Sequence, residues 1–225
     1  MTAEVRDAEG NQREIRRDAY ESARPDVQEL VPRNARRILD LGCASGALGA
    51  ALKRRQAAEV VGVELDPDYA RDAEQRLDRV ICAGVEMALT EPETLGRFDC
   101  VIAADVLEHL VDPWAALRNA AALIEPGGVA VVSLPNVRYL LTYWRLIRHG
   151  RWPREAAGPF DATHLRWFTP LDARELVAQA GLIVELEQPR YFFRGRTLAI
   201  ARKVGRARIA AEFLAGQCLL RGRRP

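Results

Sequence analysis

Short apolar runs alternate along the chain with segments of helical periodicity. Runs of strand length predict five strands, at 37–42, 59–64, 79–83, 98–104 and 129–134. The segments between them predict helices, and one of these opens with Asp66 as N-cap and Pro67 at the first helical position. Because each parallel connection needs a crossover, this alternation predicts a parallel sheet with helices on both faces.

The alternation resumes after residue 169 and extends the predicted sheet. Thr169 and Asp172 carry the capping chemistry of a helix start, a sixth strand follows at 182–186, and 217–220 is a candidate seventh strand. An aromatic, arginine-rich segment and a basic segment interrupt this pattern. The N-terminal residues predict one or two helices packed outside the sheet. The predicted organisation is an N-terminal helical segment at 1–31 and one domain at 32–225, with insertions at 135–169 and 191–215.

The most informative stretch joins the first predicted strand to the first helix. Residues 38–49 read ILDLGCASGALG, so that a strand ends, small residues turn and a helix begins. This arrangement places backbone N–H groups and a helix N-terminus at the carboxyl edge of a sheet, where ligands bind. Asp40, directly before the turn, suits a ligand that carries an ammonium group. Glu64 ends the second strand about 20 residues further on, where a carboxylate can hold ribose hydroxyls.

Two cofactors use such a loop, and the residues favour one of them. A dinucleotide site needs G-x-G-x-x-G, but Ala44 and Ala47 stand where the second and third glycines would be. A pyrophosphate would also lie poorly beside Asp40. An NAD-dependent oxidoreductase is therefore an alternative, and the amino-acid end of S-adenosyl-L-methionine (SAM) is the favoured ligand.

Four segments together resemble the motifs of class I SAM-dependent methyltransferases. DLGCASG at 40–46 resembles their glycine-rich motif, VGVELD at 61–66 their second motif, FDCVIAADVLEHL at 98–110 their fourth-strand motif, and PGG at 126–128 the turn before strand five. The resemblance covers roughly residues 35–190 and the motif set is specific as a whole. It implies an α/β fold with a Rossmann-like, doubly wound, seven-stranded, mostly parallel sheet. The antiparallel last strand would lie between strands five and six.

The resemblance also implies SAM as cofactor, S-adenosylhomocysteine as its product, and a set of contacts. Asp40 and the glycine loop would hold the methionine part, Glu64 the ribose, and Leu65 the adenine, while Asp105 would face the sulfonium and the acceptor. Many relatives hold the adenine amino group with an Asp after strand three, but residues 82–86 read CAGVE. The expected cofactor-binding residues are Asp40, Gly42, Cys43, Ala44, Ser45, Gly46, Glu64, Leu65, Val85, Glu86, Ala104, Asp105 and His109.

On the acceptor side, His164 is the candidate catalytic residue. It lies in DATHLRWFT at 161–169, which resembles a segment of bacterial methyltransferases found with polysaccharide and glycan-modifying genes. A hydroxyl acceptor benefits from a general base, so the resemblance implies His164 in that role with Asp161 or Arg166 fixing its geometry. The alternative is that Asp161 and His164 only brace the loop.

The expected function is therefore SAM-dependent methylation of a hydroxyl on a small molecule or saccharide. Amine methylation, a quinone or lipid acceptor, and a SAM-binding protein without catalysis remain alternatives. The net charge of +2 disfavours nucleic acid, because backbone binding needs a concentrated basic patch. Four scattered cysteines form no CxxC pair, and no metal site is expected.

The remaining expectations concern surroundings and partners. No stretch approaches the ~20 apolar residues of a membrane span, and the charged N-terminus lacks the core of a signal peptide, so a cytoplasmic location is expected. Leu140, Leu141, Trp144 and Ile147 follow helical spacing, which favours core packing, with a pocket roof or a homodimer surface as alternatives. A basic stripe at 194–208 favours a solvated helix face over peripheral membrane contact.

Overall fold

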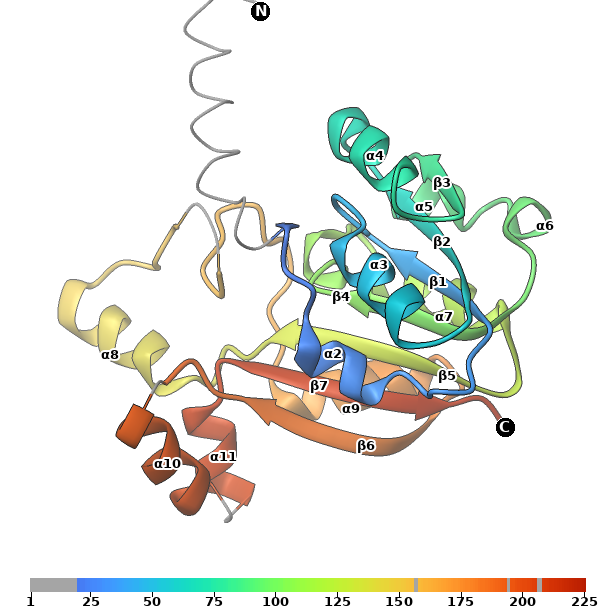
Figure 1. The fold of residues 1–225 in the computed structure, drawn as a ribbon. Coiled ribbons are helices and arrows are strands. Elements are labelled where there is room, and N and C mark those ends of the chain that lie inside the picture. Colours follow the sequence, from blue (N-terminus) through green and yellow to red (C-terminus); the bar gives the residue numbers. More distant parts are fainter. Residues whose placement is uncertain (1–19, 156–157, 194, 206–207) are drawn as a thin grey trace, which may run out of the picture.

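The computed structural model describes residues 20–225 apart from 156–157, 194 and 206–207, and it contains one seven-stranded sheet (Figure 1). The strand order is β3-β2-β1-β4-β5-β7-β6, and only β7 runs antiparallel to its neighbours. The predicted fold class and the antiparallel last strand between the fifth and sixth are thus confirmed. The strands are β1 (Arg37–Leu41), β2 (Glu59–Glu64), β3 (Arg79–Cys82), β4 (Phe98–Ala104), β5 (Ile124–Pro135), β6 (Ile183–Arg190) and β7 (Gln217–Arg223).

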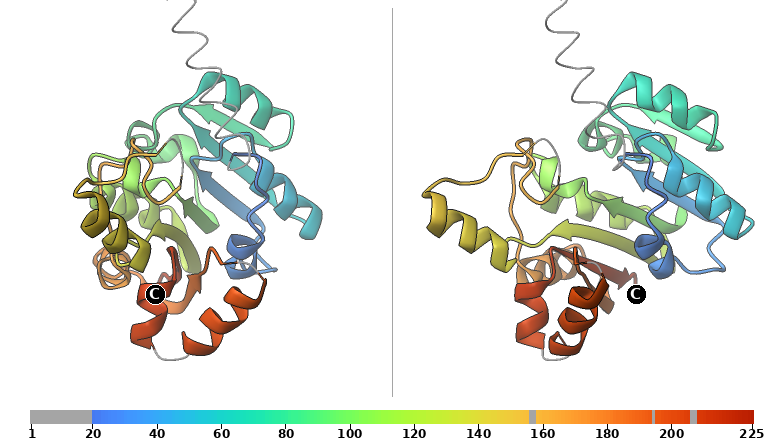
Figure 2. Two further views of the ribbon diagram at one scale, coloured as in Figure 1. Left: turned by 90° about the vertical axis from the view of Figure 1, so that its left-hand side faces the viewer. Right: turned by 60° about the vertical axis from the view of Figure 1, so that its left-hand side comes forward.

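Helices cover both faces of this sheet (Figures 1 and 2). One face packs against α2 (Pro25–Leu30), α3 (Ala47–Arg55) and α4 (Pro67–Glu74). The other packs against α5 (Val85–Ala88), α6 (Pro92–Leu95), α7 (Pro113–Ala122) and α9 (Pro170–Gln179). A short 3₁₀ helix, η1 (Leu107–His109), follows β4. The remaining helices, α8 (Leu140–His149), α10 (Gly195–Val204) and α11 (Arg208–Leu214), extend from one side of the molecule.

The period-two alternation of a strand explains how β1 serves both layers. Leu39 and Leu41 belong to the apolar layer under α7 and α9, whereas Ile38 belongs to the layer under α2 and α3. Both faces of a covered parallel sheet are apolar, which is why the strands read as near-continuous hydrophobic runs. Asp40 is the exception in β1, since only 2% of this acidic residue is exposed.

The turn and cap signals of the sequence correspond to local structure. The Asp66 Oδ1 atom accepts the N–H groups of Asp68 and Tyr69 at 2.8 and 3.2 Å, so it caps α4 as expected. Thr169 and Asp172 form a reciprocal capping box at the start of α9. The Pro-Gly-Gly turn lies within β5 as an irregularity of the pairing with β4, where the register shifts between Phe98 and Cys100.

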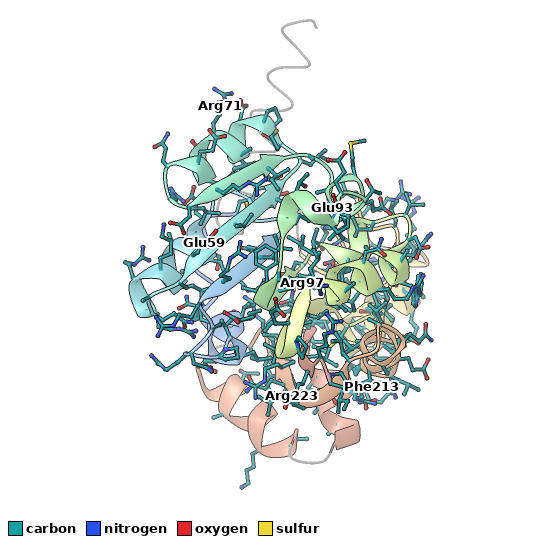
Figure 3. The ribbon with its side chains drawn as sticks, turned by 90° about the vertical axis from the view of Figure 1, so that its right-hand side faces the viewer. Glu59, Arg71, Glu93, Arg97, Phe213 and Arg223 are labelled. Atoms are coloured by element: carbon teal, nitrogen blue, oxygen red, sulfur yellow. The ribbon has the colours of Figure 1, made fainter. Side chains whose placement is uncertain are left out.

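The two ends of the chain meet the sheet differently. Residues 1–19 of the predicted N-terminal segment lie outside the described residues. The described remainder contains α2, which buries Val27 and Leu30 in the same apolar layer as parts of β5 and β7. At the amino edge of the sheet, Figure 3 shows charged side chains such as Glu59 and Arg97. Glu59 pairs with Arg37 at 3.0 Å on the surface, and pairs of this kind contribute only ~0–1 kcal/mol.

The α8 helix departs from the expectation of core packing. Leu140, Leu141, Trp144 and Ile147 are all exposed, Ile147 by 80%, and Thr142 is the buried residue of the helix. Helical spacing creates an apolar stripe on α8, but the helix projects from the domain and no described element covers that stripe (Figure 2). Among the described residues, no helix combines the length and the apolarity needed to cross a membrane.

Candidate active site

An open cavity of about 1590 Å³ lies at the carboxyl edge of the sheet. Typical small-molecule sites have about 300–1,000 Å³, so this cavity has room for a cofactor and an acceptor together. Its wall combines the loop after β1, the end of β2, the turn into α5 and the residues after β4. The lining residues are Tyr20, Gly42, Ala44, Glu64, Leu65, Asp66, Pro67, Asp68, Tyr69, Gly84, Val85, Glu86, Met87, Thr90, Asp105, Val106, His109, Leu110 and Thr163.

The glycine loop is tied to the end of β2 by backbone geometry. Gly42 has φ +70°, and a Cβ there would lie 2.8 Å from Cγ2 of Val106, so both conformation and space demand glycine. The Ala44 N–H donates to Glu64 Oε2 at 2.8 Å, and the Asp66 N–H donates to Glu64 Oε1 at 2.9 Å. A carboxylate offers about four acceptor positions, which leaves Glu64 capacity for ribose hydroxyls.

Asp40 lies two residues before Gly42 and is a buried acid whose Oδ2 atom has no hydrogen-bond partner within the described part of the chain. Burial, and then the charge of Glu64, raise the pKa of Asp40 to about 7, against the opposing influence of Arg24. Burying a carboxylate without a partner costs free energy unless a cation compensates it. The position fits the ammonium group of an amino-acid ligand.

Two exposed apolar side chains lie on the cavity wall between the end of β2 and α5, where the sequence analysis expected adenine. Leu65 and Met87 are each 72% exposed although they are large and apolar, and both line the cavity. A flat aromatic ligand there would cover surface that water now contacts. Glu86, expected near the adenine amino group, accepts the Asp112 N–H at 3.0 Å and so also supports the start of α7. Met87 was not among the expected cofactor-binding residues, and its only signal in the sequence is its position shortly after Gly84.

The expected cofactor residues divide into two groups. Those on the cavity wall are Gly42, Ala44, Glu64, Leu65, Val85, Glu86, Asp105 and His109. Asp40, Cys43, Ser45, Gly46 and Ala104 are not on it. The Cys43 side chain is buried against Gly62, and burial raises the pKa of its thiol. The Ser45 hydroxyl donates to the Tyr20 carbonyl and accepts from Arg76, both at 2.9 Å, so it fastens the N-terminal segment. The Cys43 and Ser45 side chains therefore shape the loop from behind, whereas Oδ2 of the buried Asp40 has no hydrogen-bond partner among the described residues.

Asp105 is held at the end of β4 by residues from three other elements. Its φ of +58° is a strained, left-handed conformation for a non-glycine residue. Its Oδ1 accepts from the Ser133 hydroxyl at 2.9 Å and from Gln217 Nε2 at 2.7 Å, and its Oδ2 forms an ion pair with Arg24. Arg24 also pairs with Asp26 at 3.0 Å. The N-terminal segment is thereby bound to the cavity rim.

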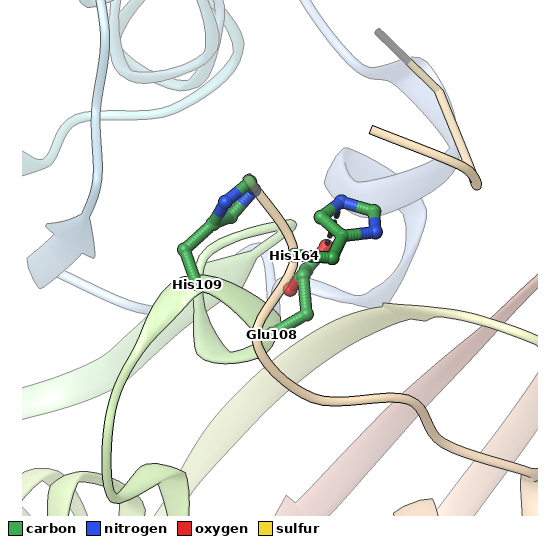
Figure 4. A group of neighbouring side chains, drawn as sticks. All are labelled: Glu108, His109 and His164. Carbon is green, nitrogen blue, oxygen red and sulfur yellow. Dashed lines mark ion pairs between the residues drawn. The ribbon is translucent and has the colours of Figure 1, made fainter. Parts of the chain in front are cut away.

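His109, which follows β4 in η1, is the histidine on the cavity wall (Figure 4). Its Nδ1 lies 3.3 Å from the Thr163 carbonyl and 3.1 Å from the Thr163 hydroxyl, which itself donates to Asp161 Oδ1 at 2.6 Å. Since a carbonyl only accepts, the proton belongs on Nδ1 of neutral His109. The lone pair of this imidazole is then on Nε2.

His164 lies beside the cavity wall, next to His109, and is not itself among the lining residues. It is buried, it is absent from the cavity wall, and its ring meets the His109 ring edge-on with centroids 4.7 Å apart. Its Nε2 is 3.9 Å from Oε1 of Glu108, a carboxyl that is 1% exposed. Burial, and then the neighbouring His109, lower the pKa of His164 to about 4. In this structure His109 therefore stands between His164 and the cavity, and it is the histidine better placed to act directly on an acceptor.

Asp161 and Arg166, which were expected to orient His164, form hydrogen bonds that hold the loop instead. The Arg166 side chain donates to the carbonyls of Leu165 and Val111, at 3.2 and 2.6 Å. The backbone N–H groups of Leu165 and Arg166 donate to the Glu108 carbonyl at 2.8 and 3.0 Å. These bonds fasten the 161–169 segment onto η1 and bring His164 beside Glu108. The Asp161 carboxylate holds the Thr163 hydroxyl and backbone N–H.

Comparison with known proteins agrees with this geometry. The sequence model of a family described as a methyltransferase domain matches residues 14–187, and the chain belongs to that family. The chain is therefore a methyltransferase by family, and its fold is that of solved SAM-dependent methyltransferases. The unpartnered Asp40 carboxyl and the Gly42 turn fit SAM, and the NAD alternative is set aside.

Particular relatives extend the comparison. A ubiquinone biosynthesis O-methyltransferase of Azorhizobium caulinodans is 36% identical over 117 residues, which are 49% of this chain and 45% of that protein. The chain thus spans about half the length of the curated relatives it matches. A SAM-dependent methyltransferase structure from Thermotoga maritima superposes with a TM-score of 0.64 at 17% identity, covering 97% of this chain and 95% of the other. The N-methyltransferase NodS from Bradyrhizobium japonicum, in complex with S-adenosyl-L-homocysteine, gives 0.57 at 18% identity, with coverages of 93% and 87%.

Proposed function

We propose that the protein transfers a methyl group from SAM to a hydroxyl group of a small, quinone-type aromatic molecule. The observation that carries this proposal is His109 on the wall of a cavity large enough for two ligands. Val106 and Leu110 supply apolar surface on the same side. The sequence analysis expected a hydroxyl of a small molecule or saccharide and kept a quinone acceptor as an alternative. The curated relatives named ubiquinone biosynthesis O-methyltransferase support that quinone-type alternative over a saccharide.

The residues of the chain would divide the work between binding and activation. Asp40 would compensate the ammonium group and Glu64 would accept from the ribose hydroxyls. SAM supplies an electrophilic methyl group when it is bound. Since the transfer is a direct displacement, the protein mainly has to align the acceptor oxygen with that methyl group. The hydroxyl must lose its proton to attack well, and His109 would be the general base that accepts it.

The test is a transfer assay with purified protein and SAM labelled in its methyl group. The acceptors are a catechol series, the same compounds with every hydroxyl already methylated, simple sugars and primary amines. We expect label only in the compounds with an open aromatic hydroxyl. Label in sugars or amines alone would overturn the acceptor class, and no transfer to any compound despite SAM binding would favour a binding protein.

Histidine variants sharpen this assay, because the chain has three histidines and His149 is exposed on α8, away from the cavity. We expect His109→Ala to lower kcat by about 10²–10⁴-fold, the usual contribution of acid–base chemistry, with S-adenosylhomocysteine affinity little changed. His149→Ala should behave as the wild type. Equal rates for the two variants would remove His109 from the reaction.

We also propose that α8 contacts an anionic membrane surface, where an apolar quinone-type acceptor would be dissolved. Leu140, Trp144 and Ile147 recur at the helical spacing of one exposed stripe, and Arg145 and Arg148 lie beside it. Sedimentation with phosphatidylglycerol vesicles should carry the wild type down, and Trp144→Ser with Ile147→Ser should stay in the supernatant. Equal sedimentation of both proteins would contradict this role for α8.

A further inference from the structure

Two linked hydrogen bonds lead from His109 on the cavity wall to an acid that is not among the lining residues. Oγ1 of Thr163 lies 3.1 Å from Nδ1 of His109, and the same hydroxyl donates its proton to Oδ1 of Asp161 at 2.6 Å. Thr163 lines the cavity, and Asp161 stands behind it. Because His109 and Thr163 are 54 positions apart in the sequence, the fold alone brings these three side chains together.

The acid and the hydroxyl belong to one tightly bonded turn. Oδ1 of Asp161 also accepts the backbone N–H of Thr163 at 2.8 Å, and the His164 N–H donates to the Asp161 carbonyl at 3.1 Å. The N–H groups of residues 165 and 166 then donate to the Glu108 carbonyl, next to His109, at 2.8 and 3.0 Å. The turn is thereby fastened to η1, and the Thr163 hydroxyl is held beside the His109 ring.

The direction of the two hydrogen bonds follows from what each atom can do. An ionised carboxylate only accepts, so the Thr163 hydroxyl gives its one proton to Asp161. The hydroxyl oxygen can then only accept from His109, as can the Thr163 carbonyl, which lies 3.3 Å from the same Nδ1. Both acceptors select the imidazole that carries its proton on Nδ1.

We propose that Asp161 and Thr163 are positioning residues that select the tautomer of His109 by fixing the direction of the Thr163 hydroxyl. The effect of this tautomer on methyl transfer rests on the proposed function, in which His109 is the general base, but the tautomer itself does not. A neutral histidine protonated on Nδ1 keeps the Nε2 lone pair that a base needs. If the hydroxyl instead donated to Nδ1, the imidazole proton would move to Nε2 and the lone pair would be lost there.

His164 limits the other freedom of the His109 ring. The two rings meet edge-on, with centroids 4.7 Å apart (Figure 4). Burial, and then the charge of His109, lower the pKa of His164 to about 4, so His164 is neutral near pH 7. A neutral ring in this contact restricts rotation of His109 and does not repel it when it takes up a proton. The Thr163 hydroxyl thus selects the tautomer, and His164 packs against the ring.

The direction of the hydroxyl leads to an expectation that a purely structural role does not share. In Asp161→Ala the Thr163 hydroxyl loses its acceptor and becomes free to donate to Nδ1 of His109. In Thr163→Val the hydroxyl is gone, but the backbone carbonyl still accepts from Nδ1, so the tautomer is kept. The double variant should therefore resemble Thr163→Val. Damage to the turn alone would make the double variant at least as poor as Asp161→Ala.

The experiment determines the tautomer by ¹⁵N NMR on protein labelled in its histidines, without SAM or acceptor and at pH 8, above the ordinary histidine pKa of about 6.5. The chain has three histidines, so the His109 signals are those that disappear in His109→Ala. We expect the Nδ1–H form in the wild type, Thr163→Ser, Thr163→Val and the double variant, and a shift to the Nε2–H form in Asp161→Ala. Asp72→Ala and Thr94→Val are matched controls at exposed positions away from the cavity and should match the wild type.

Transfer of labelled methyl groups to a catechol measures the consequence for catalysis. An acid that orients a catalytic histidine contributes up to about 10⁴-fold in kcat, and with a hydroxyl between the two we expect Asp161→Ala to lower kcat by about 10–10³-fold. The KM for the acceptor should change by less than about threefold, because Asp161 is not on the cavity wall. Thr163→Ser should keep kcat within about threefold of the wild type, and Thr163→Val introduced into Asp161→Ala should raise kcat again.

The NMR and kinetic results separate this proposal from the proposed function. An Nε2–H form in the wild type, an unchanged Nδ1–H form in Asp161→Ala, or a double variant that keeps the Nε2–H form would each overturn the positioning role. Tautomers as expected without methyl transfer to any acceptor would leave the positioning role standing and contradict the proposed function. Retained S-adenosylhomocysteine binding shows that a variant is folded, and Asp161→Leu, which also lacks an acceptor, replaces Asp161→Ala if that variant does not fold.

Discussion

The Asp40→Asn variant tests two effects of the buried carboxylate, which should lower the stability of the folded protein and strengthen ligand binding. The change keeps the shape of the side chain and removes its charge. In the folded protein, burial and then Glu64 raise the pKa of Asp40 from 3.8 to about 7. The unfolded chain releases that proton near its ordinary pKa, so the folded state binds more protons between about pH 4 and pH 7. Stability therefore falls as pH rises through this window.

The size of the effect follows from the shift. One pKa unit corresponds to about 1.4 kcal/mol, so a shift of about 3 units costs the folded state about 4 kcal/mol at pH 8, as an upper limit. Replacing Asp40 by asparagine removes this cost of about 4 kcal/mol. The asparagine amide would itself be buried without a partner, which destabilises the variant by about 1–3 kcal/mol. Asp40→Asn should thus be more stable than the wild type by about 1–3 kcal/mol at pH 8, and this advantage should shrink as the pH falls toward 4.

Urea unfolding at pH 8, 6 and 4.5 measures this difference, with Asp72→Asn on the exposed face of α4 as the control. Calorimetry on the same proteins should show that Asp40→Asn weakens S-adenosylhomocysteine binding by about 10–100-fold, the worth of a hydrogen bond to a charged group. In the wild type, ligand affinity should rise with pH toward about 7, because the ammonium group prefers the ionised acid. A variant that is less stable at every pH and binds as well as the wild type would refute the reasoning.

Three further substitutions test other parts of the site. Gly42→Ala should lower the free energy of unfolding by about 1–3 kcal/mol, because φ is +70° and the new Cβ would meet Val106; a thermal melt that matches the wild type would contradict this. Glu64→Ala should weaken SAM binding in calorimetry by about tenfold or more, and an unaltered affinity would mean that the ribose is held elsewhere. Arg24→Met should destabilise the protein by about 1–3 kcal/mol in urea, because Asp105 loses its ion-pair partner, whereas the matched change of the exposed Arg54 to Met should have little effect.

Most of the fold could be predicted from the sequence, and so could the residues expected to bind the cofactor. Alternating apolar runs, the Asp66 cap and the PGG turn are local signals, and each corresponds to local structure. The place of β7 between β5 and β6 came from the family resemblance, since no local pattern predicts which strand an antiparallel segment will pair with. The Asp40 and Gly42 positions followed from the spacing of one loop.

The residues on the acceptor side of the cavity could not be predicted in the same way. The sequence around His109 and His164 does not show which of them lines the cavity, because the position of His164 depends on the bonds from 165 and 166 to the Glu108 carbonyl. Such contacts between distant segments leave no trace in local periodicity. The α8 stripe is a similar case, because helical spacing shows that one face is apolar but does not show whether another element covers it.

Calorimetric titration of the purified protein with S-adenosylhomocysteine, beside NAD, tests the central claim most directly. We expect one saturable site for S-adenosylhomocysteine, weakened in Asp40→Asn and unchanged in Asp72→Asn, and no heat of binding from NAD. Absence of S-adenosylhomocysteine binding, or a site that takes NAD instead, would contradict the assignment of this cavity to SAM.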